Sequence, residues 1–212
     1  MPIWANPKPA GQRLICYSRV WVGPHCRGQN VGPAKGAFVD RAIQQVRPSV
    51  MVEFGTYVGY STVRWAAQLP EGGRLFSIDP EPAAQESAAL LLKRAGLADR
   101  VTLLRGTAED VIPQLAARLN GRPVDVLFVD HVKDRYLADL KLVEAAGLLR
   151  AGSVVAADNV VFFQLKAYLE HVRNSGMYRS SRTYTATLEY AEREAARDPS
   201  LVDGVELSVY AG

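Results

Sequence analysis

The chain has 212 residues, of which 48% are hydrophobic and 22% are charged, as in an ordinary globular protein rather than a disordered one. No apolar run approaches the roughly 20 residues of a membrane-spanning helix, and the N-terminus lacks the pattern of a secretory signal. The 25 basic and 22 acidic residues leave a formal charge of +3, with no basic stripe of the kind that binds nucleic acid. We therefore expect one globular domain, 1–212, with no membrane or nucleic-acid partner.

The cysteines and histidines predict no zinc site. Cys16 and Cys26 are the only cysteines, they are not spaced as C-x-x-C, and the three histidines are scattered. Two free thiols fit a reducing compartment, which predicts a cytoplasmic protein. The sequence leaves both a monomer and a homodimer open.

Short apolar runs alternate with helical patterns along most of the chain. The expected elements are helix Ala34–Val46, strand Ser49–Phe54, helix Tyr60–Leu69, strand Arg74–Ile78, helix Pro82–Ala95, strand Val101–Arg105, helix Ala108–Leu119, strand Val124–Val129, helix Tyr136–Ala146, strand Ser153–Ala157 and helix Gln164–Asn174. A last strand, Glu206–Tyr210, is expected to pair antiparallel with a segment near Tyr184–Leu188. This order predicts a doubly wound α/β fold, a mostly parallel sheet with an antiparallel C-terminal edge. Residues 1–48 form an N-terminal cap and helix, and residues 49–212 form the core.

The first strand ends in an acidic residue and two glycines, Glu53, Gly55 and Gly59. Tyr57 stands where a dinucleotide fingerprint needs its second glycine, which argues against that fingerprint. An acidic strand end suits a cationic ligand such as S-adenosylmethionine, which carries an ammonium and a sulfonium but no phosphate. Asp79 closes the second strand, near the roughly 20-residue spacing at which an acid receives ribose hydroxyls. A plain strand–helix turn is the alternative reading of the glycines.

Oxygen-bearing side chains also close the fourth and fifth strands. Asp130 follows the fourth strand, and Asp158 and Asn159 follow the fifth. Two carboxylates and an amide at neighbouring strand ends suit Mg²⁺, although Asp and Asn also form turns at such positions. Lys133 is close enough to Asp130 in the chain to act as a base beside a cation, or it is an exposed surface lysine. His131 is not spaced as a zinc ligand.

Taken together, these segments resemble the catechol O-methyltransferases, a Mg²⁺-dependent family that uses S-adenosylmethionine. The matching segments are VGPAKG (Val31–Gly36), EFGTYVGYSTVR (Glu53–Arg64), VDHVKDRYLADLKLVEAAGLLRAG (Val129–Gly152), ADNV (Ala157–Val160) and LEY (Leu188–Tyr190). The resemblance runs from about Asn30 to the C-terminus. It implies a seven-stranded Rossmann-like methyltransferase fold and methyl transfer from S-adenosylmethionine to one hydroxyl of an ortho-diphenol.

The resemblance also implies roles for individual residues. Lys133 is the implied general base, and the implied Mg²⁺ ligands are Asp130, Asp158 and Asn159. The implied cofactor-binding residues are Val31, Glu53, Gly55, Tyr57, Ser61, Asp79, Ala108, Glu109, Asp130 and His131. The implied acceptor-binding residues are Glu189, Lys133, Asn159, Arg27, Val132 and Phe163.

The chain departs from the family at the walls around the acceptor. Arg27 and Val132 stand where members that act on small catechols have tryptophans, and Phe163 stands near their proline. A charged segment, Ala191–Leu201, is also longer than in the family. These departures predict an ortho-diphenol with an acidic or bulky substituent. The alternatives are an O-methyltransferase of a larger ortho-diphenol such as a caffeoyl ester or natural-product intermediate, an NAD-dependent oxidoreductase, and a cofactor-binding protein without catalysis.

Overall fold

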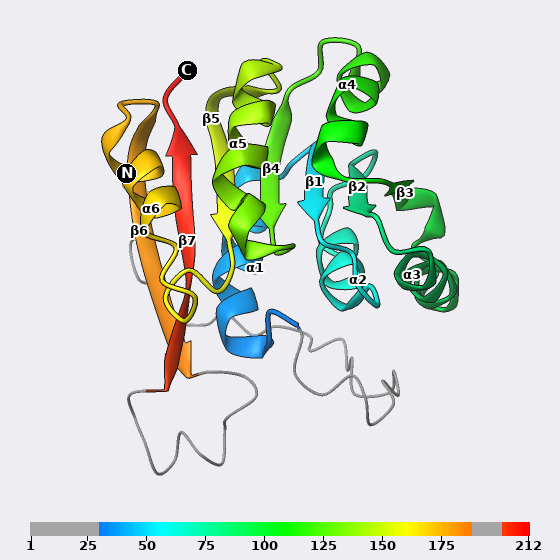
Figure 1. The fold of residues 1–212 in the computed structure, drawn as a ribbon. Helices are drawn as coiled ribbons and strands as arrows, with labels where there is room; N and C mark the ends of the chain where they lie inside the picture. The colour runs from blue at the N-terminus through cyan, green and yellow to red at the C-terminus, as the bar shows by residue number, and fades with distance from the viewer. Residues whose placement is uncertain (1–29, 188–200) are drawn as a thin grey trace.

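The computed structural model describes residues 30–187 and 201–212, and its centre is a seven-stranded sheet (Figure 1). The strand order is β3-β2-β1-β4-β5-β7-β6. The first five strands run parallel, and β7 pairs antiparallel with both β5 and β6. The strands are β1 (Val50–Phe54), β2 (Arg74–Asp79), β3 (Val101–Arg105), β4 (Val124–Val129), β5 (Leu149–Ala157), β6 (Tyr178–Thr187) and β7 (Val202–Tyr210). The predicted fold class is confirmed.

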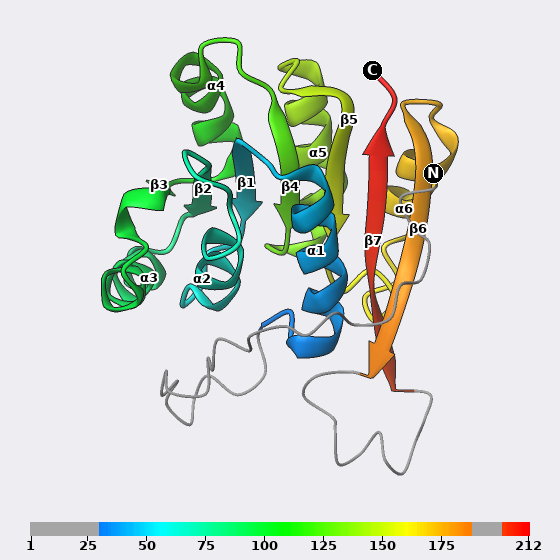
Figure 2. The same cartoon turned by 180° about the vertical axis from the view of Figure 1, so that it is seen from behind.

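Helices cover both faces of the sheet. The helices are α1 (Pro33–Val46), α2 (Tyr60–Ala66), α3 (Pro82–Ala95), α4 (Ala108–Leu119), α5 (Tyr136–Ala145) and α6 (Lys166–Asn174), with short 3-10 turns at Ala98–Arg100 and Lys133–Arg135. Helices α4, α5 and α6 pack on the face that Figure 1 shows in front, and α1 and α2 pack on the face shown in Figure 2. Because each central strand is covered on both sides, β1 and β4 are buried along their whole length.

Local signals set several helix ends. Thr107 caps α4 in a capping box with Asp110, in which each side chain binds the other's backbone N–H. Gly96 ends α3 in the left-handed conformation, with φ 70°. Helix α6 begins at Lys166 rather than Gln164, because Gln164 has φ 50° and lies outside helical geometry.

At the antiparallel edge, the predicted strands were shorter than those in the structure. Strand β7 begins at Val202 rather than Glu206, and β6 extends back to Tyr178. Asp203 and Gly204 are residue types typical of a turn, yet here they lie inside β7, where each pairs with a residue of β6. Strand β5 also begins earlier, at Leu149, and its pairing with β4 shifts register near Val124.

Some predictions fall on residues outside the described ranges. These are the acceptor-binding roles of Arg27 and Glu189, the thiols Cys16 and Cys26, and nearly all of the added segment, residues 191–200. Within the described ranges, no helix is both long and apolar enough to cross a membrane. A single domain and a cytoplasmic location stay predictions.

Candidate active site

A cavity of about 760 Å³ opens at the carboxyl ends of the parallel strands. Parallel pairing of β1 with β2 and β4 brings the loops after these strands to one edge of the sheet, where open α/β folds bind their ligands. The loop after β5 joins them through its pairing with β4. The lining residues are Asn30, Gly55, Thr56, Tyr57, Tyr60, Ser61, Asp79, Pro80, Glu81, Asp130, His131, Val132, Lys133, Asn159 and Phe163.

Gly55 allows the loop after β1 to pass directly beside Asp130. Its φ is 96°, a conformation that favours glycine, and its N–H donates to the carbonyl oxygen of Ile78 at 2.9 Å. A Cβ at this position would overlap the carbonyl oxygen of Asp130. Glycine at this position therefore permits the ends of β1 and β4 to touch. A plain strand–helix turn would not require this contact.

Asp79 holds the same loop from the end of β2. Its Oδ2 accepts hydrogen bonds from the N–H groups of Thr56 at 3.0 Å and Tyr57 at 2.9 Å. Its Oδ1 accepts from the N–H of Glu81 at 2.9 Å. Asp79 lines the cavity while these backbone groups fix its orientation, and carboxylate oxygens have lone pairs to spare for further donors.

Glu53 lies fully buried behind the cavity wall on β1. Its Oε2 accepts from the hydroxyls of Thr62 and Ser77, each at 2.6 Å, whereas its Oε1 has no hydrogen-bond partner in the described part of the chain. Burial raises the pKa of Glu53 to about 7, although the surrounding hydroxyl donors favour the charged form. A buried carboxylate with an oxygen to spare fits a cationic group. Ser61, in the first turn of α2, lines the cavity above it.

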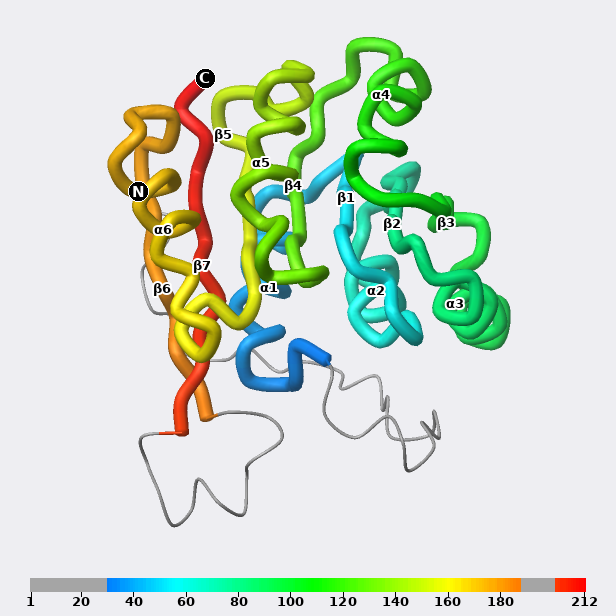
Figure 3. Tube along the Cα trace, in the orientation of Figure 1, coloured from blue at the N-terminus to red at the C-terminus, as the bar shows by residue number. Residues whose placement is uncertain are grey.

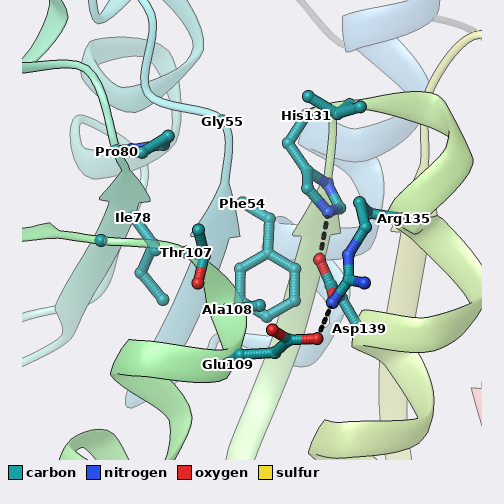
Figure 4. A pocket seen from close by; sticks show the side chains of 12 residues that line it. Phe54, Gly55, Ile78, Pro80, Thr107, Ala108, Glu109, His131, Arg135 and Asp139 are labelled. Carbon is teal, nitrogen blue, oxygen red and sulfur yellow. Dashed lines mark hydrogen bonds and ion pairs between the residues drawn. The ribbon is translucent and has the colours of Figure 1, made fainter.

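A second cavity of about 180 Å³ adjoins the first, and the two share Gly55, Pro80, His131 and Val132. A chain of polar contacts closes one side of it (Figure 4). His131 Nε2 contacts Asp139 at 2.7 Å, Arg135 contacts Asp139 at 2.9 Å, and Arg135 also pairs with Glu109. The opposite wall is apolar, from Phe54, Ile78, Pro80 and Ala108. A flat heterocycle with a few polar edges fits such a lining.

Lys133 is held between two groups at the end of β4. Its Nζ donates to Asp130 Oδ1 and to the hydroxyl of Tyr136, each at 2.7 Å. It also lies 5.7 Å from the centre of the Phe163 ring. Tyr136 is buried, and burial raises the pKa of its hydroxyl well above the ordinary value, so it stays a neutral hydrogen-bond partner. Lys133 is therefore a positioned amine that lines the cavity rather than an unconstrained surface lysine.

Asp158 and Asn159 follow β5, beside the loop that carries Asp130. Asp158 is fully buried, and its Oδ2 has no hydrogen-bond partner within the described ranges. Burial and the neighbouring Asp130 carboxylate raise the pKa of Asp158 well above its usual range, against the opposing effect of Lys35. Two carboxylates near one another, one with an unpartnered oxygen, are a donor set that a divalent cation fits. Asn159 adds a neutral oxygen and has φ 60°.

Asp130, Asp158 and Asn159 are not a metal site made of three carboxylate, histidine or cysteine ligands. Residues 30–187 and 201–212 contain no group of three His, Cys, Asp or Glu side chains placed to hold a metal. The candidate set has two carboxylates, and its third member is the amide of Asn159. Such a set suits Mg²⁺, which keeps several positions for water or substrate, better than it suits zinc.

Sequence reasoning missed two buried charged residues next to this set, Lys35 on α1 and Asp203 on β7. Both are fully buried, and Lys35 Nζ lies 2.7 Å from Asp158 Oδ1 and 2.5 Å from Asp203 Oδ2. A signal was present for each. Lys35 shares the buried face of α1 with Val39 and Ile43, and Asp203 stands in a strand that is buried along most of its length. A charge at a core position indicates a buried partner.

The remaining predicted residues fall into two groups. Val31 is fully buried in the core, and its neighbour Asn30 is the residue that lines the cavity. Val132 and Phe163 stand at the cavity mouth with 66% and 50% of their surfaces exposed. The structure thus brings Glu53, Gly55, Tyr57, Ser61, Asp79, Asp130, His131, Lys133, Asp158 and Asn159 to one edge of the sheet, with Ala108 and Glu109 in the adjoining cavity.

The sequence model of the O-methyltransferase family matches residues 22–208. The chain belongs to this family and is an S-adenosylmethionine-dependent O-methyltransferase. Its relatives within the family include catechol O-methyltransferases. It is 41% identical over 186 residues to that of Sus scrofa, covering 88% of this chain and 95% of the relative. It is 40% identical over 197 residues to that of Mus musculus, covering 93% and 69%.

The fold is shared with solved methyltransferase structures. The O-methyltransferase TomG from Streptomyces achromogenes, in complex with SAM, superposes with a TM-score of 0.72 and 27% identity, over 87% of this chain and 82% of that one. An O-methyltransferase from Bacillus cereus, in complex with SAH, has a TM-score of 0.73 at 24% identity, over 86% and 83%. The second comparison supports the fold alone.

Proposed function

We propose that the protein transfers a methyl group from S-adenosylmethionine to one hydroxyl of a catechol, in a Mg²⁺-dependent reaction with Lys133 as the general base. The observation that carries the proposal is the convergence of Asp130, Lys133 and Asn159 on one cavity, beside an oxygen of Asp158 that has no hydrogen-bond partner among the described residues. The relatives named catechol O-methyltransferase support this acceptor class.

The donor end is assigned to the loops after β1 and β2. Glu53 and Ser61 would receive the ammonium and carboxylate of the methionine part, and Asp79 would receive the ribose hydroxyls. The adjoining apolar cavity with Ala108, Glu109 and His131 would hold the adenine. These residues would fix the donor beside the acceptor end, and alignment of reacting atoms alone can supply several kcal/mol.

At the acceptor end, Asp130, Asp158 and Asn159 would hold the cation. When bound there, Mg²⁺ would supply Lewis-acid chemistry, which makes a phenol easier to deprotonate. Lys133 lies in the same cavity, held by Asp130 and Tyr136, and its amine would take the proton from the hydroxyl that is methylated. The new bond joins that oxygen to the methyl carbon as the sulfur–carbon bond breaks. Glu189 is proposed to accept a hydrogen bond from the second hydroxyl.

A larger ortho-diphenol is the second candidate acceptor, and the cavity mouth favours it. Val132 presents a short side chain there, and Phe163 presents a half-exposed ring. Neither encloses a small ring as two facing aromatic walls would, a contact worth about 0.5–1.5 kcal/mol. We therefore propose that acceptors with an acidic or bulky substituent are preferred over catechol amines, with Arg27 pairing to an acid.

The test is a panel of acceptors incubated with S-adenosylmethionine and Mg²⁺, with and without EDTA, and analysed by mass spectrometry. We expect methylation of ortho-diphenols, little of matched monophenols, and loss of turnover with EDTA. Methylation of monophenols at equal rates would overturn the acceptor class. Comparing kcat/KM for a catechol acid and a catechol amine, in wild type and Arg27→Ala, tests the preference. An unchanged ratio would remove Arg27 from the site.

A further inference from the structure

A buried ion pair joins α1 to the start of β7 directly behind the candidate metal ligands. Asp203 Oδ2 accepts from Lys35 Nζ at 2.5 Å and from Asn159 Nδ2 at 2.6 Å. Lys35 Nζ also contacts Asp158 Oδ1 at 2.7 Å. Lys35, Asp158 and Asp203 are fully buried, and Asn159 is 4% exposed. Four polar side chains from three separate parts of the chain therefore make one network that solvent does not reach.

The network contacts one polar side-chain atom of Asp158 and one of Asn159. The other polar atom of each side chain is an oxygen that the network does not contact. An ionised carboxylate only accepts, so the atom of Asn159 that faces Asp203 is its amide nitrogen, and the carbonyl oxygen faces away. Lys35 Nζ forms an ion pair with Oδ1 of Asp158, while Oδ2 has no hydrogen-bond partner within the described ranges. Each ligand is thereby oriented with one oxygen to spare.

The backbone after β5 is fixed to the same strand. The N–H of Phe162 donates to Asp203 Oδ1 at 3.0 Å, and the N–H of Val160 donates to the carbonyl oxygen of Gly204 at 3.1 Å. A Cβ at Gly204 would lie 2.8 Å from the side chain of Val161, so glycine permits this close contact. In Figure 3 the loop that follows β5 runs beside the start of β7. Strand β7 therefore holds the segment that carries Asn159.

We propose that Lys35 and Asp203 are positioning residues that orient Asp158 and Asn159 to bind the divalent cation of the methyl-transfer site. The inference rests on the proposed function, because it assumes that Asp158 and Asn159 are metal ligands. Neither Lys35 nor Asp203 is assigned contact with the cation or the substrates. Partners of this kind, which orient ligands through hydrogen bonds, change metal affinity about 10- to 100-fold when removed.

If Lys35 and Asp203 affected metal affinity through their charges alone, two variants would behave differently from what the positioning role predicts. Lys35→Met removes a positive charge beside the cation site, which by charge alone would tighten metal binding. The double variant Lys35→Met with Asp203→Leu removes one charge of each sign and leaves the local charge unchanged. A buried pair replaced as a unit by apolar residues of similar size commonly preserves folding. Weaker metal binding in the double variant would therefore report on orientation.

Strand β7 also offers a matched control three residues further on. Glu206 is fully buried and pairs with Arg173 of α6, at 2.9 Å and 3.0 Å. Arg173→Met with Glu206→Leu removes an ion pair that joins the same strand to α6 rather than to the candidate ligands. Any effect that is common to both double variants reflects disturbance of the strand and not orientation of Asp158 and Asn159.

The experiment measures Mn²⁺ binding by electron paramagnetic resonance, with saturating S-adenosylhomocysteine, in wild type, in Lys35→Met and in both double variants. We expect a 10- to 100-fold loss of Mn²⁺ affinity for the Lys35/Asp203 variant and less than a twofold change for the control. Affinity for S-adenosylhomocysteine, measured by calorimetry, should stay within about twofold in each, which also reports folding. Asp203→Asn is the second variant and should show the same loss.

The outcomes distinguish failure of the positioning role of Lys35 and Asp203 from failure of the proposed metal site itself. Unchanged Mn²⁺ affinity in the Lys35/Asp203 variant, or an equal loss in the control, would overturn the positioning role while the metal site stands. Tighter binding in Lys35→Met would show that Lys35 acts through its charge, and would also overturn it. If the wild type binds no Mn²⁺, the metal site of the proposed function is itself wrong.

Discussion

The proposed donor end and the proposed acceptor end of the site are built by different means. At the donor end, backbone groups and hydroxyls do most of the holding: Asp79 accepts from backbone N–H groups, and Glu53 accepts from Thr62 and Ser77. At the acceptor end, charged side chains hold one another. Lys133 pairs with Asp130, and Lys35 bridges Asp158 and Asp203.

The difference follows from what each end is proposed to bind. The donor is a large ligand with many polar groups, so a loop with a few fixed acceptors can recognise it. A divalent cation needs several negative oxygens close together, and these repel one another unless cations of the protein lie among them. Substitutions at the donor end should therefore change the affinity for the donor, and substitutions at the acceptor end should change turnover.

The largest expected effect is at the acceptor end. Lys133→Ala should lower kcat by about 10²- to 10⁴-fold, because it removes the proposed proton acceptor. Affinity for S-adenosylhomocysteine should not change, since Lys133 is not assigned to the donor end. Steady-state kinetics and calorimetry measure the two quantities. Lys141→Ala, an exposed lysine on α5, is the control and should keep full activity. Retained kcat in Lys133→Ala would exclude the lysine as base.

At the donor end, Glu53 should make the stability of the free protein depend on pH. Burial raises its pKa from 4.5 to about 7, so the folded state holds a proton that the unfolded state has lost. The stabilisation is full below pH 4.5 and is lost as pH rises through 7, by on the order of 3 kcal/mol. Urea unfolding of wild type and Glu53→Gln from pH 4.5 to 8 isolates this contribution. Parallel pH profiles for the two proteins would contradict it.

Gly55 lies where the two ends meet, so its substitution should damage both. Gly55→Ala places a Cβ against Asp130 in a left-handed backbone, and overpacking of this kind costs about 1–3 kcal/mol. Gly96→Ala is the matched control, because its φ is 70° and nothing lies within 4 Å of the added Cβ. Thermal unfolding should show the larger loss for Gly55→Ala. Equal losses would mean that the contact with Asp130 is not what requires glycine.

The smallest effect is expected for the ribose contact of Asp79. Asp79→Ala should weaken S-adenosylhomocysteine about tenfold, or about 1.4 kcal/mol, because it removes a charged acceptor. The substitution also releases the N–H groups of Thr56 and Tyr57, so a second ligand separates the two causes. A 2′-deoxy analogue should bind more weakly than the parent ligand to wild type, but equally to Asp79→Ala. A difference that persists in the variant would place the ribose elsewhere.

The two ends also differ in how far the sequence predicts them. The donor loop is local: Glu53, Gly55 and Asp79 lie within one strand–helix–strand unit, and the predicted strand ends place them correctly. The bounds of α3, α4, β3 and β4 also match the prediction, because caps and apolar runs are short-range signals.

The network behind the acceptor end was not predictable in the same way. Lys35 and Asp203 are 168 positions apart, and only the completed sheet brings β7 beside β5 and α1 over both. Asp203 and Gly204 also have the local preferences of a turn, which concealed the first residues of β7. Tertiary pairing with β6 overrides those preferences. The buried charges were visible in the sequence, but their partners were not.

The most direct measurement of metal-dependent transfer is methylation of an ortho-diphenol titrated with Mg²⁺, in wild type and Asp158→Ala. Wild type should show a saturable dependence on Mg²⁺, and the variant should show little turnover at any concentration while it still binds S-adenosylhomocysteine. Turnover that survives chelation in wild type and persists in Asp158→Ala would contradict a metal site at the ends of β4 and β5.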